Sequence, residues 1–165
     1  MTDSFSSPIL YFLLFGLPGS WAYRLVNTSD SMIAYRSEEF EWGGKFTAWC
    51  DTGLNWIPAR ISAGMILIGA FLFPGASFRK SYQCLLRERK KTASPNAGWT
   101  MSAMAGALDV ILTKKGEYTL NGGSSPLNSK KIDICLKITV LSLMLTMVVL
   151  IVLIRGGLWA LNMVG

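Results

Sequence analysis

The stretch ITVLSLMLTMVVLIVLI, from Ile138 to Ile154, contains seventeen residues without a charge between two basic ones. The hydrocarbon core of a bilayer requires about 17–25 residues of helix, so this stretch is long enough to span it. A second uncharged stretch of eighteen residues, from Ile61 to Phe78, lies between two arginines and meets the same criterion. A buried helix of a soluble protein is the alternative for either stretch, but the two together predict a membrane protein.

A third apolar stretch, Phe5 to Tyr23, is equally long but is interrupted by Gly16-Leu17-Pro18-Gly19. It can span, dip into the membrane and return, or pack inside the protein, and the sequence leaves these three paths open. No basic segment precedes it and no clear small-residue cleavage site follows it, so it does not resemble a secretory signal. The 165 residues suffice for one domain. We therefore expect a single all-α, membrane-embedded domain over 1–165, with two or three spans and short amphipathic helices at the membrane edge.

Basic residues are unevenly distributed around these stretches. Residues 24–60 carry four basic and five acidic side chains, whereas residues 79–137 carry eleven basic side chains and far fewer acidic ones. Since Lys and Arg remain preferentially on the cytoplasmic side, we expect a multi-pass protein of the cell membrane whose basic loop 79–137 is cytoplasmic. A basic cluster can also bind nucleic acid, but one beside a span is more often a topology signal. No nucleic-acid partner is predicted, and the expected environment is membrane lipid.

The residue inventory excludes several kinds of catalytic site. The chain has no histidine, and its three cysteines are far apart in the sequence. The usual zinc sites and every mechanism that needs a histidine base are therefore excluded. No G-x-x-x-x-G-K-[ST] motif occurs, so any nucleotide would be held without a P-loop.

Local patterns predict the elements between the apolar stretches. Residues 20–36 contain no Pro or Gly and should continue the first apolar stretch as a helix. Residues 38–45 are predicted as a polar turn. Residues 46–56 are predicted as a short helix with Asp51 and Asn55 on one face, followed by Pro58 in the first turn of the next helix.

A helix made largely of Ala, Ser, Gly and Met is predicted to begin near Trp99, followed by a loop over 114–131. The apolar stripe of this helix consists of Met101, Met104, Leu108 and Ile111. Its small-residue face, on the opposite side, consists of Ser102, Ala103, Gly106 and Ala107. Such a small face permits tight packing of a neighbouring helix or close approach of a large ligand. Asn96, held by Pro95, can cap this helix or present its amide to a ligand at the helix N-terminus.

Three polar clusters flank the apolar stretches. They are Asn27–Ser31 with Tyr35 and Arg36, Asp51 with Asn55 and Arg60, and Ser94–Gly98. Carboxylates, arginines and amides together suit phosphate and divalent-cation chemistry, because Mg²⁺ prefers carboxylate and phosphate oxygens and Arg binds phosphate. The alternative is that these groups satisfy one another between helices.

Three motifs at these clusters read FGLPGSWAYRLVNTSDSMIAYR (15–36), LNWIPARISA (54–63) and SPNAGWTMSAMAGALDV (94–110). They resemble the CobD/CbiB family of cobalamin biosynthesis, the membrane-bound adenosylcobinamide-phosphate synthases, and the similarity runs in order from about Thr2 to Asn121. Members attach an aminopropanol, or its phosphate, to the one free carboxylate of adenosylcobyric acid. The resemblance thus implies an amide-forming ligase that uses ATP and Mg²⁺ and has a corrinoid substrate.

The resemblance also implies roles for individual residues. Asp30 and Asp51 are expected to bind Mg²⁺, Arg36 and Arg60 to bind phosphates, and the catalytic set is completed by two amides that orient the substrates, Asn27 and Asn55. Mg²⁺ and arginine would offset the charge that develops on phosphoryl oxygens. The corrinoid is broad and flat and would lie against the small-residue helix and the turn before it, with the expected contacts Ser94, Asn96, Gly98 and Gly106.

The chain departs from the family in length and at one carboxylate. Members are about twice as long, with the missing part ahead of Met1, so we expect a separate N-terminal-half protein or self-association to complete the fold. Asp51 is present, but Thr52 replaces the second Asp of the family motif, which removes a possible metal ligand. A non-catalytic membrane fragment, or a scaffold resembling the AmpE-type signalling proteins, is therefore the alternative function.

One conflict concerns the path of the second apolar stretch. If 61–78 crosses the membrane fully, the polar clusters in 24–60 and 79–137 lie on opposite sides and cannot share a site. Pro74-Gly75 near its end permits a broken or re-entrant path, which is tolerated where protein covers the freed backbone. The sequence leaves both paths open.

Overall fold

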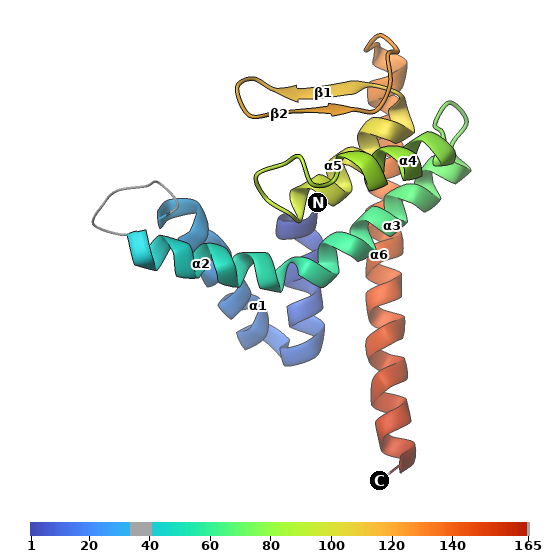
Figure 1. Cartoon of the computed structure of the whole chain (residues 1–165). Coiled ribbons are helices and arrows are strands. Elements are labelled where there is room, and N and C mark those ends of the chain that lie inside the picture. Colours follow the sequence, from blue (N-terminus) through green and yellow to red (C-terminus); the bar gives the residue numbers. More distant parts are fainter. Residues whose placement is uncertain (34–40, 165) are drawn as a thin grey trace.

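The computed structural model describes residues 1–33 and 41–164, and its fold is mostly helical (Figure 1). A short antiparallel hairpin is the β structure within these ranges. In chain order the elements are the π-helix η1 (Thr2–Ser6), α1 (Ser7–Ile33), α2 (Glu41–Leu54), α3 (Trp56–Leu72), α4 (Phe78–Glu88), α5 (Ala97–Leu108), β1 (Ile111–Lys114), β2 (Tyr118–Asn121) and α6 (Ser129–Val164).

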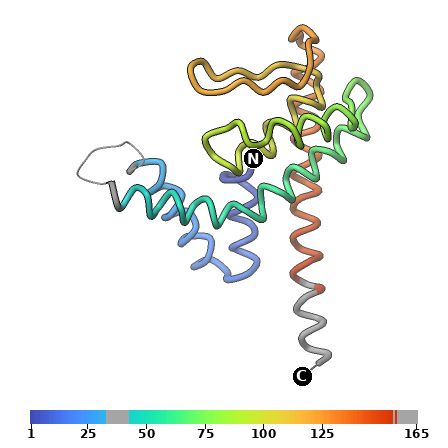
Figure 2. The backbone as a smooth tube through the Cα atoms, viewed as in Figure 1, coloured from blue at the N-terminus to red at the C-terminus, as the bar shows by residue number. Residues whose placement is uncertain are grey.

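Helix α1 turns back on itself at Gly16, where the backbone adopts φ 68° and ψ −157°. In a straight helix Tyr11 and Tyr23 would be about 18 Å apart, because each residue adds about 1.5 Å. Instead their rings stack with centroids 5.4 Å apart, and the Tyr23 hydroxyl donates to the carbonyl oxygen of Asp3 at 3.3 Å. A Cβ at Gly19 would lie 2.6 Å from the Tyr11 carbonyl oxygen, so the close return requires glycine there. Of the three paths open for 5–23, the structure has the one that turns back (Figure 2).

Helices α2 and α3 form a pair bent by 46° around Asn55. Helix α2 begins at Glu41, so the predicted polar turn is wrong over residues 41–45, while residues 38–40 lie outside the described part. The helix predicted over 46–56 instead ends at Leu54, because the chain bends at the next residue. Pro58 does lie in the first turn of α3, as predicted.

Helix α3 ends at Leu72, before the predicted end of the second apolar stretch. Phe73 is extended, with φ −94° and ψ 123°, which is the conformation favoured before a proline. Gly75 then adopts φ 92°, and the chain reverses into α4 (Figure 2). Of the two paths left open for 61–78, the structure therefore has the broken one, because the Pro-Gly pair ends the helix.

Helix α6 extends well beyond the predicted 138–154 and crosses α3 (Figure 1). The two helices pack closely, since a Cβ at Gly69 would lie 2.9 Å from Cγ2 of Ile138. Among the described residues, two helices are long and apolar enough to cross a membrane, Thr2–Met32 and Ser129–Ile154, or three if the bent pair 43–54 and 56–72 is one span. The expected class, a helical membrane protein with two or three candidate spans, is confirmed. Helix α1, one of these candidates, folds back at Gly16.

The small-residue helix α5 is covered by α4. A Cβ at Gly106 would lie 2.4 Å from the Lys80 carbonyl oxygen and 2.6 Å from Cβ of Cys84, and Ser81 Oγ donates to the Ala103 carbonyl at 2.6 Å. The small face therefore serves tight helix packing, the first of the two alternatives. Ile111 does not belong to the helical stripe, because α5 ends at Leu108 and Asp109 takes a left-handed conformation with φ 58°.

A β-hairpin occupies part of the region predicted as the loop 114–131. Strands β1 and β2 pair from Ile111 opposite Asn121 to Lys114 opposite Tyr118. Glu88, at the end of α4, holds the hairpin: its side chain is 2% exposed, and Oε2 accepts the Asn121 N–H at 3.0 Å. Burial alone would raise the pKa of Glu88, but hydrogen bonds from Lys91, from the Asn121 N–H and from Arg87 hold that pKa below its ordinary value.

The hairpin form of α1 predicts that its two ends face the same side of the membrane. In a protein whose native cysteines are replaced by alanine, Ser4→Cys and Thr28→Cys should react alike with a membrane-impermeant maleimide, either both in intact cells or both only after lysis. Leu17→Cys, at the exposed apolar tip, should resist the reagent in both conditions because lipid covers it. If Ser4→Cys and Thr28→Cys label from opposite sides, α1 is a full span.

The contacts of Glu88 predict a pH-dependent contribution to stability. A carboxylate whose pKa is lowered by folding stabilises the protein above its unfolded value, here 4.5, and loses that contribution as the pH falls through the folded value. At pH 7, Glu88→Gln should cost about 1.5–3 kcal/mol, because it removes the charge of a buried acceptor that binds the Asn121 N–H and two cations. The difference from wild type in thermal unfolding should shrink below about pH 4.5.

The matched control is Glu117→Gln, which breaks the exposed ion pair with Lys114. Exposed pairs contribute about 0–1 kcal/mol, so this variant should unfold close to wild type. Equal destabilisation by the two variants, or a Glu88→Gln effect that is the same at pH 3.5 and pH 7, would contradict the role assigned to Glu88.

Candidate functional site

Asn55 lies at the bend between α2 and α3. Its side chain connects this bend to both halves of α1, the one before Gly16 and the one after it. Its side chain is 1% exposed. Its Oδ1 accepts hydrogen bonds from Ser7 Oγ, at the start of α1, and from the Tyr23 hydroxyl, at 2.9 Å, in the returning arm. Its Nδ2 is buried without a hydrogen-bond partner among the described residues. Asn55 therefore connects three helical segments through hydrogen bonds to its Oδ1, while its Nδ2 makes no hydrogen bond with a described residue.

An acidic patch lies beside this joint. Asn27 Nδ2 donates to Asp51 Oδ1 at 3.0 Å, which fixes the orientation of that carboxylate. Asp30 and Asp3 both lie within electrostatic range of Asp51. The structure therefore brings together Asn27, Asp30 and Asp51 as the sequence predicts. Arg36 lies outside the described residues.

Asp3 belongs to the same patch but was not predicted as a site residue. The sequence shows it only as one acidic residue before an apolar stretch, with no motif around it. The reversal of α1 carries η1 back towards the returning arm, as the hydrogen bond from Tyr23 to the Asp3 carbonyl shows. Only that reversal places Asp3 near Asp30 and Asp51.

The loop between α4 and α5 returns to α2. Asn96, which is 4% exposed, donates from Nδ2 to the Thr52 carbonyl oxygen at 2.8 Å, while its Oδ1 is buried without a partner in the described part of the chain. Asn96 makes no capping hydrogen bond to α5. Ser94 Oγ instead accepts the Ala97 N–H at 3.5 Å. Gly98 allows the loop to close, because a Cβ there would lie 2.0 Å from the Arg89 carbonyl oxygen.

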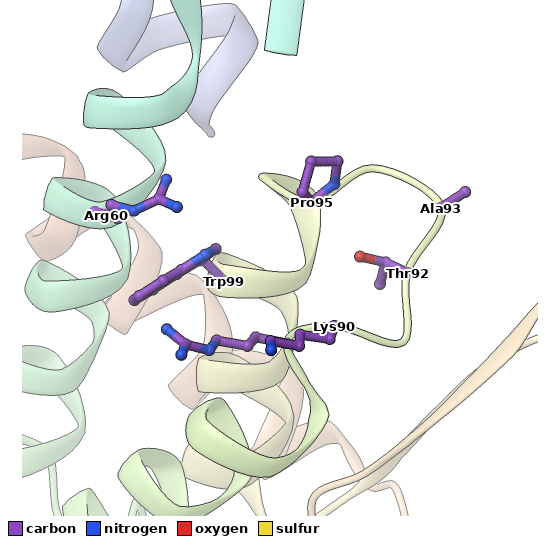
Figure 3. A pocket seen from close by; sticks show the side chains of 7 residues that line it. Arg60, Lys90, Thr92, Ala93, Pro95 and Trp99 are labelled. Atoms are coloured by element: carbon purple, nitrogen blue, oxygen red, sulfur yellow. The ribbon is translucent and has the colours of Figure 1, made fainter. Parts of the chain in front are cut away.

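A basic pocket of about 410 Å³ opens next to this loop (Figure 3). The Arg60 guanidinium lies 4.6 Å and the Arg89 guanidinium 4.4 Å from the centroid of the Trp99 ring. Arg60 also lies 3.8 Å from the Trp56 ring. The lining is completed by Lys90, Thr92, Ala93 and Pro95.

Five residues of this basic pocket were not predicted from the sequence, namely Arg89, Lys90, Thr92, Ala93 and Trp99. The two cations belong to the basic cluster that was interpreted as a topology signal, and Trp99 was interpreted as the start of a helix. The sequence did offer one indication that Trp99 belongs to the site, because Trp99 directly follows the Ser94–Gly98 cluster. The sequence did not show that α3 and the α4–α5 loop meet there.

The acidic patch and the basic pocket adjoin each other, which resolves the topological conflict. Because the chain reverses between α3 and α4, the α4–α5 loop comes back to the end of α3 that carries Arg60. The contact between Asn96 and Thr52 links the loop to α2 directly. Residues 24–33, 41–60 and 89–99 thus supply one candidate site, from which Gly106 is excluded because α4 covers it.

The residues present match one common way of holding Mg²⁺. Among the described residues, no three His, Cys, Asp or Glu side chains gather closely enough to hold a metal ion by themselves. Mg²⁺ is, however, often held by one or two carboxylates together with substrate phosphates. Asp30 and Asp51 suit that arrangement, since neither is in an ion pair with another described residue.

Comparison with known proteins identifies the family of the chain. The family model for CobD/CbiB proteins matches residues 1–144. A probable cobalamin biosynthesis protein CobD of Methanothermobacter thermautotrophicus is 44% identical over 145 residues, which cover 88% of this chain and 48% of that protein. The cobalamin biosynthesis protein CobD of Dehalococcoides mccartyi is 48% identical over 125 residues, which cover 76% of this chain and 40% of that protein.

The chain therefore spans less than half the length of these relatives. No solved structure matches it. The family match extends over α1 to α5, the hairpin and the first half of α6, and so includes every described residue of the acidic patch and the basic pocket. On this evidence, the chain belongs to the CobD/CbiB family of cobalamin biosynthesis proteins.

Proposed function

We propose that this chain takes part in the amide-forming step of cobalamin biosynthesis, in which an aminopropanol or its phosphate is joined to the free carboxylate of adenosylcobyric acid. The observation that supports this most is the meeting of the three family motifs at one place. Residues of different motifs make direct contacts there, namely Tyr23 with Asn55 and Arg60 with Trp99. Asn27 and Asn96 also bind Asp51 and Thr52, which lie shortly before the second motif.

The arrangement suits a reaction that passes through an acyl phosphate. In such a reaction the terminal phosphoryl group of ATP is transferred to the substrate carboxylate and ADP leaves. The amine nitrogen then attacks the acyl carbon, inorganic phosphate leaves, and the amine loses a proton as the amide forms. Both steps develop negative charge on phosphoryl oxygens, which positive groups in a fixed position stabilise.

The residues of the site would divide this work between them. The Arg60 guanidinium is held against two indole rings and donates to the Trp56 carbonyl oxygen, so it is oriented to bind a phosphoryl group. Asp30 and Asp51 would hold Mg²⁺, which when bound neutralises phosphate charge. Asn27 would keep the Asp51 carboxylate oriented, and Asn55 and Asn96 would act as positioning residues through their buried hydrogen bonds.

A non-catalytic scaffold role is the second candidate, and two observations favour it. The side chains of Asn55 and Asn96 make hydrogen bonds that hold helices and loops together, and Thr52 stands where the family motif has a second Asp. A scaffold would need these contacts but would not need the charges of Asp30 and Asp51. Replacing those charges therefore separates the two candidates.

We expect Asp30→Asn to abolish function without loss of protein. Asp30 is half-buried and makes no described hydrogen bond or ion pair, so its replacement by a side chain of equal size should leave membrane abundance unchanged. In a strain that lacks the activity and is supplied with the remainder of a full-length relative, conversion of adenosylcobyric acid should fall at least about 100-fold, because loss of a charge-assisted interaction at a reaction centre costs about 3 kcal/mol. Product is measured by mass spectrometry.

The matched control is Asp133→Asn, on the exposed surface of α6, which should convert the substrate as wild type does. Asn96→Ala should reduce abundance together with activity, because it leaves the half-buried Thr52 carbonyl oxygen without its donor. Wild-type conversion by Asp30→Asn would support the scaffold role instead.

We also propose that the site faces the cytoplasm, where ATP is available. The basic residues of 79–137 favour this side, and the contact of Asn96 with Thr52 requires Thr52 to lie on it too. Ser124→Cys, in the exposed loop before α6, should therefore react with an impermeant maleimide after lysis and not in intact cells. Labelling of intact cells would place the site on the outer side.

A further inference from the structure

Helix α4 has a buried face and, beside it, an exposed apolar row. The helix begins at Phe78 because the side chain of Ser77 caps it, accepting the Lys80 N–H at 3.4 Å. The buried face consists of Ser81, Cys84, Leu85 and Glu88. Phe78, Tyr82 and Leu86 are spaced one helical turn apart and therefore lie in one row. These three residues are 44%, 47% and 51% exposed, so the described part of the chain leaves the row largely uncovered.

The row continues across the chain reversal onto α3. Phe71, in the last turn of α3, is 75% exposed. Its ring meets the Phe78 ring edge-on, with centroids 6.4 Å apart, and the Phe78 ring stacks on the Tyr82 ring at 6.3 Å. Two helices on either side of the reversal thus share one continuous surface, which we call the aromatic row: Phe71, Phe78, Tyr82 and Leu86.

Contacts with α6 give the level of this row in the membrane. A Cβ at Gly69 would lie 2.9 Å from Cγ2 of Ile138, and a Cβ at Gly75 would lie 2.9 Å from Cδ1 of Ile134. The end of α3 and the turn into α4 therefore lie against the part of α6 where its uncharged run begins. That part is the boundary between headgroups and acyl chains, where aromatic side chains are enriched. Helix α4 runs across the direction of α6 (Figure 1), as a helix in the plane of the bilayer would.

The polar side of α4 is basic and keeps one cation without an acidic partner. This side consists of Arg79, Lys80, Gln83 and Arg87, all exposed. Lys80 and Arg87 form ion pairs with carboxylates of the protein, whereas Arg79 forms none with any described residue. A helix with an apolar row and a basic polar side is typical of the membrane interface. An unpaired cation at that level is attracted by anionic headgroups.

We propose that α4 lies in the plane of the cytoplasmic bilayer surface, with the aromatic row among the upper acyl chains and Arg79 bound to the headgroup of an anionic phospholipid. The eleven residues of α4 rise only about 16 Å, which is too short to cross a hydrocarbon core of about 30 Å. Helix α4 leads directly into the α4–α5 loop, so this contact would hold that loop at the membrane surface. The inference does not depend on which reaction the chain takes part in.

The first experiment measures the depth of α4 in lipid. The full chain, with its native cysteines replaced by alanine, is placed as one copy per nanodisc of phosphatidylcholine with about 30% phosphatidylglycerol. An environment-sensitive fluorophore is attached at Tyr82→Cys, at Leu86→Cys or at Gln83→Cys. A nitroxide near the top of a lipid acyl chain should quench the first two at least about threefold more strongly than the third, because an interfacial helix buries its apolar face about 5–10 Å deep. Aqueous iodide should show the reverse order.

The matched control for depth is the neighbouring position. Tyr82 and Gln83 are both exposed on the protein itself, so only an outside occupant can separate them, and neither replacement disturbs the buried face. Leu86→Cys keeps the test valid if loss of the Tyr82 ring alters the row. Thr119→Cys, in the exposed hairpin, should behave as Gln83→Cys does.

The second experiment measures the preference for an anionic headgroup. With the fluorophore at Leu86→Cys, nitroxide-labelled phosphatidylglycerol should associate about fivefold more strongly than labelled phosphatidylcholine, which is the effect of about one cation at the surface. Arg79→Gln should remove this preference. Lys115→Gln makes the same change of charge in the hairpin turn and should keep the preference within about twofold of the unchanged protein.

Four outcomes would overturn the proposal. They are equal quenching at positions 82 and 83, equal association of the two lipids with the unchanged protein, equal loss of preference in Arg79→Gln and Lys115→Gln, and protection of position 82 that appears only when a nanodisc holds two copies. The last result would assign the aromatic row to a second copy of the chain. Conversion by Asp30→Asn bears on the proposed function alone and leaves the membrane contact of α4 to these two measurements.

Discussion

The side-chain carbonyl of Asn55 accepts hydrogen bonds from Ser7 and Tyr23 at the point where α2 and α3 meet. Ser7 begins α1 and Tyr23 belongs to its returning arm, so one buried amide connects three separate helical segments. Asp51 lies one turn before this joint and Arg60 lies just after it. The acidic patch therefore takes a residue from the last turn of α2 and the basic pocket one from the start of α3, and how the two adjoin depends on the bend that Asn55 occupies.

Close approach of backbones is the second requirement of the fold. Gly106 lies against the backbone of α4, Gly69 against Ile138 of α6, and Gly98 against the Arg89 carbonyl. Helices in a membrane gain little from the hydrophobic effect when they associate, so small residues that allow dense packing are favoured at their contacts. Here that packing holds α3, α4, α5 and α6 together, and it fixes the α4–α5 loop where it meets α2.

The neighbouring charges of opposite sign suit chemistry on phosphates. Carboxylates without cationic partners attract a divalent cation, and guanidinium groups without acidic partners attract phosphate oxygens. Asp30 and Asp51 supply the first kind, while Arg60 and Arg89 supply the second. The two sets do not neutralise each other in the described structure, because no ion pair forms between them. A ligand that carries both a metal ion and a phosphate would satisfy both.

The sequence by itself determined the membrane class, the family and several residues of the candidate site. Uncharged runs predict membrane helices because charges are costly in hydrocarbon, and the motifs that contain Asn27, Asp30, Arg60 and Asn96 identify the family. Helix ends were less predictable, as the end of α3 at Leu72 and the strand over Tyr118–Asn121 show, because local propensity is weaker than packing and turn geometry. The tertiary structure alone decided that α1 turns back at Gly16 and that α3 reverses into α4. Those two reversals bring Asp3 to Asp51 and Arg89 to Arg60, and they depend on contacts between residues far apart in the chain, which no local pattern in the sequence records.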